Sequence, residues 1–435
     1  RGKVKIIGGE ERERGGGGGG RPGENPPPQQ ADAMARPVMS LKFMPRSNCR
    51  ICFAQEAPLL ATGSVPGGGC ITLRILRTSA GLARSLALID EAVTEFDKPP
   101  AAFCRLCWSK GGSSCPAGLI AGGLESGEVA VWDPRVALSD MPCLDRDEEH
   151  FIAKLQETNS LYRELELEYD FCELEKRQES LARPPLLEET TGNLVAAEPV
   201  SSLDPQAPVA RFSKHLGSVR GLEFSHYWPN LIGSGAENGR IMVWDLANPC
   251  AETMPTWKTE SIAGDAISCI SWSPLMPRVI GSTSFQGLNI WDTRTCKSPM
   301  KSVGLFPRRL SGLAFSAIKQ NSLVVSYEDY LDTASLAVWD LRRMDKPVSE
   351  LCENANGVIA MAWSPHGDDA LLVSTKNDKL MIWNLEKQEA IWKGNSDSGR
   401  CYDVQWSPSS RGVFAAASYN YLELFKLHDR EIPLA

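Results

Sequence analysis

The stretch Ile241-Met242-Val243-Trp244-Asp245 decides the fold of this chain, because four further stretches repeat its design. Each is an apolar run closed by Trp and then Asp or Asn. The five pairs are Trp132-Asp133, Trp244-Asp245, Trp291-Asp292, Trp339-Asp340 and Trp383-Asn384. The last four tryptophans follow one another at intervals of 47, 48 and 44 residues, close to the roughly 40 to 45 residue period of a four-stranded propeller blade. The repeat predicts an all-β chain folded as a β-propeller.

Seven copies of a larger unit can be traced along the chain. Each copy has an inner strand that ends in an aromatic residue, a strand of small residues, and a third strand that carries the Trp position. We assign residues 38–43 to the start of blade one, and the last copy carries Phe425 where the others carry Trp. One blade cannot bury its own faces, whereas a closed ring leaves only short, protected strand edges. We therefore expect a seven-bladed WD-repeat β-propeller.

The spacing of the repeats also predicts the domain organisation. Trp132 and Trp244 are 112 residues apart, so about 65 residues are inserted between blades two and three. Residues 1–37 are predicted to be a disordered Gly- and Pro-rich tail with a candidate closing strand at 4–7. Residues 38–143 hold blades one and two, residues 144–208 hold an acidic helical insertion and its linker, and residues 209–435 hold blades three to seven.

The insertion is acidic and amphipathic. Residues 145–189 include 14 acidic and 6 basic residues. Apolar side chains at Phe151, Leu155, Leu161 and Leu165 predict one or two α-helices that end before Pro184. Two interpretations stay open. The helices form either a solvated surface element or a partner-docking or coiled-coil arm whose apolar stripe binds a groove or another helix.

Composition and charge argue against several classes of function. The formal net charge is −8, and no basic stripe of the kind that binds nucleic acid or an anionic membrane surface is present. No apolar run approaches the roughly 20 residues that span a bilayer, and no secretory signal follows Arg1. We expect a soluble, cytoplasmic protein, and the sequence leaves open whether it is a fragment of a longer one.

The cysteines favour free thiols over disulfides or a metal site. The chain has 13 cysteines, an odd number that suits a reducing compartment. Two C-x-x-C pairs occur, Cys49/Cys52 and Cys104/Cys107. In the predicted strand at 103–108, residues three apart face opposite sides of the sheet and cannot share one zinc ion. We therefore expect no metal.

The motif residues are predicted to be structural. Each Trp should lie buried between blades, and each Asp or Asn should accept backbone N–H groups in the turn that follows. His215, just before blade three, should be a buried, hydrogen-bonded imidazole. No phosphate-loop, zinc-protease or nucleophile-elbow motif is present. We therefore expect no catalytic residues, no cofactor and no small-molecule substrate, and we assign function to protein-binding surfaces.

Several segments resemble one known family. They include Leu60-Ala61-Thr62-Gly63, Leu119-Ile120-Ala121-Gly122-Gly123, His215-Leu216-Gly217-Ser218-Val219-Arg220, Ile267-Ser268-Cys269-Ile270-Ser271-Trp272 and Cys401-Tyr402-Asp403-Val404-Gln405-Trp406. These segments are similar to the N-terminal WD-repeat propeller of the large outer-coat subunit of the COPII vesicle coat, a protein transport protein of the Sec thirty-one type. The resemblance covers residues 38–143 and 209–428.

The resemblance implies a scaffold that acts in vesicle-mediated transport from the endoplasmic reticulum to the Golgi. It places the propeller on the cytosolic face of endoplasmic reticulum exit sites and on COPII vesicles. The implied partners are other coat propellers and coat subunits. Association with the membrane would be peripheral and would occur only through coat assembly.

Two alternative functions stay open. Substrate receptors of cullin-type ubiquitin ligases are WD propellers that present Trp-Asp-x-Arg to an adaptor, and this chain has three such motifs, ending at Arg135, Arg294 and Arg342. The other alternative is a scaffold subunit of another coat-like complex. The proteins that co-purify with the chain would separate these functions.

Overall fold

The computed structural model describes a set of strands in the N-terminal third of the chain and most of its C-terminal half. The described residues are 39–42, 50–55, 59–64, 70–78, 86–88, 101–111, 118–134, 208–246, 257–259, 265–294, 298–328, 335–352, 356–367, 369–396, 399–418 and 421–427. All elements with defined bounds in these ranges are β-strands. The prediction of an all-β chain is confirmed.

Six four-stranded sheets are each built from four consecutive strands. The first sheet holds β2(Arg50–Phe53), β3(Leu59–Ser64), β4(Cys70–Thr78) and β5(Leu86–Leu88). The second holds β6(Phe103–Trp108), β7(Ile120–Leu124), β8(Val129–Trp132) and β9(Ala210–Phe212). The third holds β10(Val219–Phe224), β11(Leu231–Ala236), β12(Ile241–Asp245) and β13(Trp257–Lys258).

The next three sheets follow the same order. The fourth holds β14(Ile267–Trp272), β15(Val279–Ser284), β16(Gly287–Asp292) and β17(Lys301–Gly304). The fifth holds β18(Leu310–Phe315), β19(Ser322–Tyr327), β20(Leu336–Asp340) and β21(Ser349–Leu351). The sixth holds β22(Val358–Trp363), β23(Ala370–Thr375), β24(Lys379–Asn384) and β25(Glu389–Asn395).

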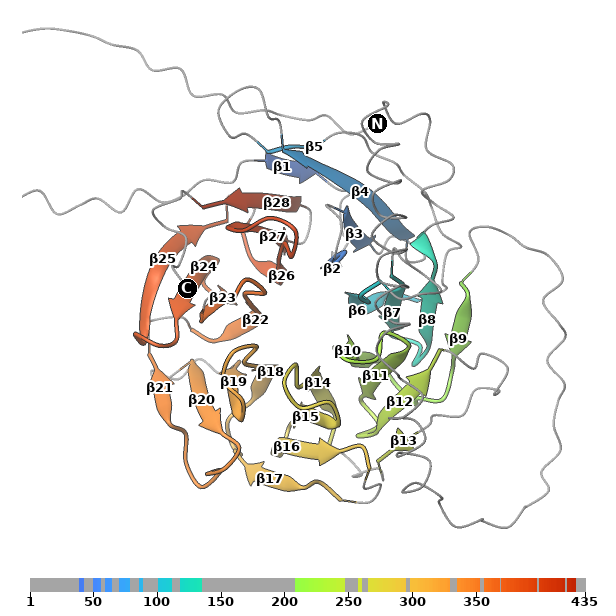
Figure 1. The fold of residues 1–435 in the computed structure, drawn as a ribbon, viewed down its shortest axis with the longest axis vertical. Helices are drawn as coiled ribbons and strands as arrows, with labels where there is room; N and C mark the ends of the chain where they lie inside the picture. Colours follow the sequence, from blue (N-terminus) through green and yellow to red (C-terminus); the bar gives the residue numbers. More distant parts are fainter. Residues whose placement is uncertain are drawn as a thin grey trace, which may run out of the picture.

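A last four-stranded sheet, called here the composite sheet, joins the two ends of the described chain. Its strand order is β1(Met39–Lys42), β28(Tyr421–Lys426), β27(Val413–Ser418) and β26(Cys401–Trp406). The first strand of each of the other sheets, and β26 of the composite sheet, lies nearest the central axis (Figure 1). These inner strands contact one another in an unbroken circle from β2 through β6, β10, β14, β18, β22 and β26 back to β2. The prediction of a β-propeller is confirmed.

Closure of the ring corrects one assignment made from the sequence. Strand β1 pairs antiparallel with β28, with Met39 opposite Leu424 and Lys42 opposite Tyr421. Residues 38–43 were predicted to start blade one, but this strand completes the composite sheet, and the first sheet begins at β2. An apolar alternation predicts a strand, whereas its partner is decided by the sheet edge that is left open, which is a property of the tertiary fold.

Apolar side chains fill the spaces between adjacent sheets. Ile241 of the third sheet packs in one cluster with Trp272 and Trp291 of the fourth. At the seam of the ring, Ile51 of β2 packs in one cluster with Leu424 of the composite sheet. Because each sheet is covered by its neighbours on both faces, the core is distributed around the ring and does not lie at the centre.

Several predicted segments lie outside the described residues. They are the tail at 1–37 with its candidate closing strand at 4–7, and the helical insertion with Phe151, Leu155, Leu161 and Leu165. The insertion and the domain boundaries therefore stay predictions. Within the described ranges, no helix is long and apolar enough to cross a bilayer.

Candidate functional site

The five Trp positions of the repeat are buried. The exposed fractions are 0% for Trp132, 1% for Trp244, 4% for Trp291, 2% for Trp339 and 4% for Trp383. Each tryptophan belongs to an apolar cluster that combines its own sheet with the preceding one. Phe425 takes the equivalent place in the composite sheet, in a cluster shared with the sixth sheet. These side chains hold neighbouring sheets together.

In the third and fourth sheets, serine hydroxyls bind the tryptophan rings. Trp244 Nε1 donates to Ser234 Oγ over 2.8 Å, and Trp291 Nε1 donates to Ser282 Oγ over 2.9 Å. The Ser234 hydroxyl also lies 2.7 Å from Nε2 of His215. Burial lowers the pKa of His215 to about 4, so this imidazole is neutral at neutral pH and is part of the structural network.

In the fifth and sixth sheets, a valine stands where the serine would be. Ser234 lies two residues after the residue that pairs with Trp244. The same position in β19 is Val325, beside Trp339, and in β23 it is Val373, beside Trp383. The indole N–H groups of Trp339 and Trp383 are buried and have no hydrogen-bond partner among the described residues. Packing alone holds these two rings.

Two of the Asp positions stabilise the turn that follows the Trp strand. Asp292 Oδ1 accepts the backbone N–H of Arg294 over 3.0 Å, and Asp340 Oδ1 accepts the backbone N–H of Arg342 over 2.9 Å. Nη2 of each arginine also donates to Oδ2 of the same carboxylate. The distance is 2.6 Å for Arg294 and 2.8 Å for Arg342. These hydrogen bonds lower the pKa of both carboxyl groups.

The other three positions differ in their partners. Asn384 Oδ1 accepts the backbone N–H of Lys387 over 2.9 Å, which is again a turn contact. Asp245 Oδ1 accepts from Nδ2 of Asn230 over 2.6 Å and so joins the end of β12 to the loop between β10 and β11. Asp133 is half-buried at the end of β8. None of the five pairs lines the cavity described next.

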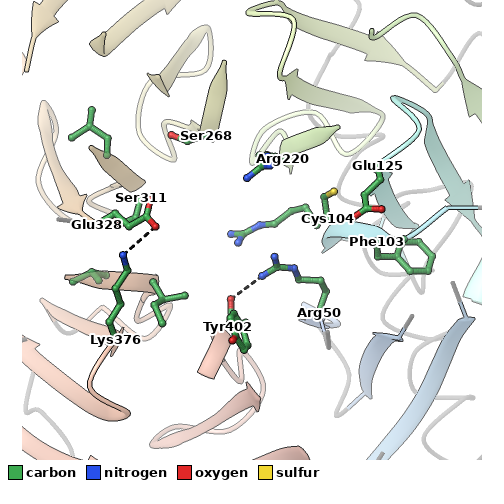
Figure 2. Close-up of a pocket in the computed structure, with 15 residues that line it drawn as sticks. Arg50, Phe103, Cys104, Glu125, Arg220, Ser268, Ser311, Glu328, Lys376 and Tyr402 are labelled. Carbon is green, nitrogen blue, oxygen red and sulfur yellow. Dashed lines mark hydrogen bonds and ion pairs between the residues drawn. The ribbon is translucent and has the colours of Figure 1, made fainter. Parts of the chain in front are cut away.

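A cavity of about 530 Å³ lies on the axis of the ring, at the end where the inner strands begin (Figure 2). Six inner strands, all except β2, have a register shift directly after their first residue, which leaves the second residue out of the ladder. All six of these second residues line the cavity: Cys104, Arg220, Ser268, Ser311, Ile359 and Tyr402. A bulge redirects a side chain, so the repeated bulge determines the chemistry of the cavity wall.

One side of the cavity carries three arginines from consecutive sheets, Arg50 of β2, Arg105 of β6 and Arg220 of β10. Figure 2 shows Arg50 and Arg220 directed into the cavity. Arg50 Nη1 donates to the carbonyl oxygen of Tyr402 over 2.8 Å. Arg105 Nη1 lies 3.8 Å from Oδ1 of Asp403, a buried carboxylate. These arginines form what we call the arginine side.

Carboxylates accompany the cations of this cavity. Arg220 Nη2 lies 2.7 Å from Glu237 Oε1, and this hydrogen bond lowers the pKa of Glu237. Across the cavity, Lys376 Nζ lies 3.1 Å from Glu328 Oε1 (Figure 2). Glu125 also lines the wall and lies beside Cys104, on the arginine side (Figure 2). The cavity therefore has an arginine side and an opposite side of mixed charge.

The cysteine pair at 104 and 107 is divided between two environments. Cys104 lines the cavity, whereas Cys107 packs against the cluster between the second and third sheets. Burial raises the pKa of both thiols, which disfavours the thiolate that zinc requires. In the part of the chain that the structure describes, no three His, Cys, Asp or Glu residues are grouped to hold a metal ion.

Sequence reasoning missed the cavity, because its wall comes from segments spread over more than 300 residues. A usable signal was nevertheless present. Alignment of the inner strands on their closing aromatic residue puts Arg50, Arg105 and Asp403 at one equivalent position and Arg220 and Tyr402 at another. Polar residues at two fixed places in otherwise apolar strands indicate a shared surface on the axis.

The similar proteins of known name that are described here are all Sec31 proteins. The chain is 32% identical over 215 residues to mouse "Protein transport protein Sec31B", which is 49% of this chain and 18% of the relative. It is 31% identical over 234 residues to human "Protein transport protein Sec31A", which is 53% of this chain and 19% of the relative. "Protein transport protein SEC31" of Mycosarcoma maydis is 24% identical over 397 residues, covering 85% of this chain and 24% of the relative. The chain carries a Sec31-type propeller.

A comparison of folds finds a similar architecture in a solved structure. The propeller matches a chain of a solved structure titled "COPII on membranes, outer coat vertex" with a TM-score of 0.59 and 18% identity, over 88% of this chain and 85% of that one. At this identity the match shows a shared fold. No protein-family model matches the chain. The chain spans less than a quarter of the length of the Sec31 relatives named above.

Proposed function

We propose that this chain is a scaffold of the COPII outer coat and acts in vesicle-mediated transport from the endoplasmic reticulum to the Golgi. The observation that carries the proposal is its similarity to Sec31 proteins, which extends over 85% of the chain in the fungal relative. The propeller fold that it shares with a chain of a COPII outer-coat structure is consistent with this role. In this role the propeller works through protein contacts and is not an enzyme.

The proposal includes a place in the cell and a set of partners. The chain would act at the cytosolic face of endoplasmic reticulum exit sites and on COPII vesicles, where it would contact other coat propellers and coat subunits. Its membrane association would be peripheral and would depend on coat assembly. The titles of the matching structures, which describe COPII on membranes, support this placement.

The ring in this proposal has seven blades. Six are the sheets of consecutive strands, and the composite sheet is the last. Asp403 supports closure at this seam, because its Oδ2 accepts the backbone N–H of Ile51 over 3.1 Å and so joins β26 to β2. A closed ring presents two rims of loops, which are the surfaces available to coat partners.

Affinity purification tests the coat proposal. A tagged form of the chain, purified from cross-linked cells and analysed by quantitative mass spectrometry, should be enriched in COPII coat subunits. An unrelated propeller with the same tag is the control. Recovery of no coat subunit above that control would contradict the proposal.

The cullin-receptor alternative has one observation in its favour, the three Trp-Asp-x-Arg motifs. In the two that the structure describes, the side chains of Arg294 and Arg342 are 72% and 73% exposed, but each guanidinium group is bound to the aspartate two residues earlier. This geometry stabilises a turn and limits the hydrogen bonds left for an adaptor. Enrichment of a cullin adaptor without coat subunits in the same purification would favour this alternative.

We propose that the acidic insertion is a partner-docking arm, with Phe151, Leu155, Leu161 and Leu165 as its contact residues. The support is its amphipathic sequence pattern. Deletion of residues 147–183 should abolish binding of one partner and leave the melting temperature of the propeller unchanged. Retention of every partner by the deletion variant would remove this hypothesis.

A further inference from the structure

The arginine side of the central cavity has the donors that a carboxylate-binding site needs. Each guanidinium group carries five N–H donors, and the donors of Arg105 are available to a ligand. The nearest carboxylate oxygen to this side chain, on Asp403, is 3.8 Å away, which is beyond hydrogen-bond distance. Among the described residues, no oxygen accepts a hydrogen bond from the Arg105 side chain.

Hydrogen bonds within the ring hold two of the three arginines in place. The three come from β2, β6 and β10, whose neighbouring strands contact each other. Arg50 is fixed by the Tyr402 carbonyl oxygen and Arg220 by Glu237. Guanidinium groups bind carboxylates in a planar, two-bond geometry, and groups that are already positioned lose less conformational entropy on binding.

The opposite side of the cavity selects among anions. Leu310, Val358 and Ile359 give it an apolar part, and the carboxylate of Glu328 lies on the same side, whereas Glu125 lies beside Cys104 on the arginine side (Figure 2). Together these carboxylates disfavour a small anion of high charge density such as phosphate, whereas the apolar part suits a hydrocarbon group. The volume of about 530 Å³ lies in the range of pockets that hold molecules larger than an inorganic ion.

We propose that this cavity binds an acidic peptide segment of a partner protein. One or two peptide carboxylates bind the guanidinium groups of Arg50, Arg105 and Arg220. An apolar side chain next to them packs against Leu310 and Ile359. The proposal rests on the cavity alone and does not depend on the assignment to the COPII coat.

A labelled peptide tests the proposal directly. The probe is a fluorescein-labelled hexapeptide of alternating glutamate and leucine, and its control has glutamine at each glutamate. In fluorescence anisotropy with the whole chain, the glutamate peptide should bind at least about 10-fold more tightly than the control, the effect of roughly one charge-assisted hydrogen bond. Inorganic phosphate at a concentration of about 10 mM should not displace it, given the carboxylates of Glu125 and Glu328 in the cavity wall.

Two variants locate the binding on the arginine side. R220Q removes a guanidinium group from a side chain that is 58% exposed, so the fold should be retained. R105K keeps the charge that faces Asp403 and removes the planar group. Each should weaken binding of the glutamate peptide about 10-fold with an unchanged melting temperature. The matched control is R411Q, an exposed arginine in the loop at the other end of β26, which should bind like the wild type.

Three results would overturn the proposal. The first is equal affinity for the glutamate and glutamine peptides. The second is unchanged binding in both R220Q and R105K. The third is displacement of the peptide by inorganic phosphate at equal affinity, which would make the cavity a simple anion site. A chain that fails to recover COPII subunits but shows the predicted peptide preference would contradict the coat assignment and leave this site in place.

Discussion

In the third and fourth sheets each Trp ring is held by a serine, whereas in the fifth and sixth sheets a valine stands at the same place. Ser234 and Ser282 accept hydrogen bonds from the indole N–H groups. Val325 and Val373 have no acceptor atom in their side chains. All of the rings concerned are at least 96% buried. The comparison teaches that burial between sheets is the shared requirement of the Trp position, and that the hydrogen bond is an addition made in some sheets.

The largest expected effect comes from removal of a ring. W291A empties a site in the cluster between the third and fourth sheets and should lower the free energy of unfolding by about 3 to 5 kcal/mol. W339A, whose ring makes no hydrogen bond, should cost nearly as much. Thermal and denaturant unfolding measure both changes. A cost for W339A below about 1 kcal/mol would show that burial is not the shared requirement.

The second effect is a pH dependence that arises from His215, which contacts the third sheet through Ser234. His215 has a folded-state pKa of about 4 against 6.5 when unperturbed. Between these values the unfolded state binds the proton and the folded state does not, so stability falls as pH is lowered from 6.5 to 4. The full loss is about 3 kcal/mol below pH 4.

The variant H215Q isolates the contribution of His215 to the pH dependence of stability. Carboxyl groups titrate in both proteins, so the difference in unfolding free energy between wild type and variant should change across pH 4 to 6.5. A difference that stays constant over this range would show that His215 titrates equally in the folded and unfolded states.

The third effect is loss of a serine hydroxyl. S234A leaves the buried Trp244 N–H without an acceptor and removes the contact to His215, and should cost about 1 to 3 kcal/mol. S282A breaks only the bond from Trp291 and should cost less. Equal unfolding curves for wild type and S234A would mean that these hydrogen bonds do not add to stability.

The smallest expected effect is a gain in stability. V325T places a hydroxyl of similar size beside the buried N–H of Trp339, which has no partner in the described structure. Because that donor is already desolvated, a new hydrogen bond should stabilise the fifth sheet by about 0.5 to 1 kcal/mol. V325A is the control and should destabilise through its cavity. A V325T variant as unstable as V325A would indicate that the hydroxyl does not reach the ring.

The sequence predicted the parts of the fold that repeat. The Trp positions and the inner strands recur with one spacing, and local alternation was enough to place them. The assignment of residues 38–43 to blade one was wrong, because β1 pairs with β28 at the other end of the chain. No local pattern contains that information.

The cavity is a second feature that local sequence patterns did not predict. Neither Cys104 nor Arg220 was predicted to line a site, yet bulges after Phe103 and Val219 turn them toward the axis. Six bulges at equivalent places define the wall, and their functional meaning emerges only when the strands are arranged around one axis. The motif that revealed the fold lies between the sheets, and the proposed binding groups lie at the centre.

The most direct test of the coat assignment is electron cryo-tomography of COPII coats assembled on liposomes with the tagged chain added. We predict ring-shaped density for the propeller within the outer coat, located by the tag, and loss of that density when the chain is omitted. Coats that assemble normally while the chain stays in solution would contradict the assignment.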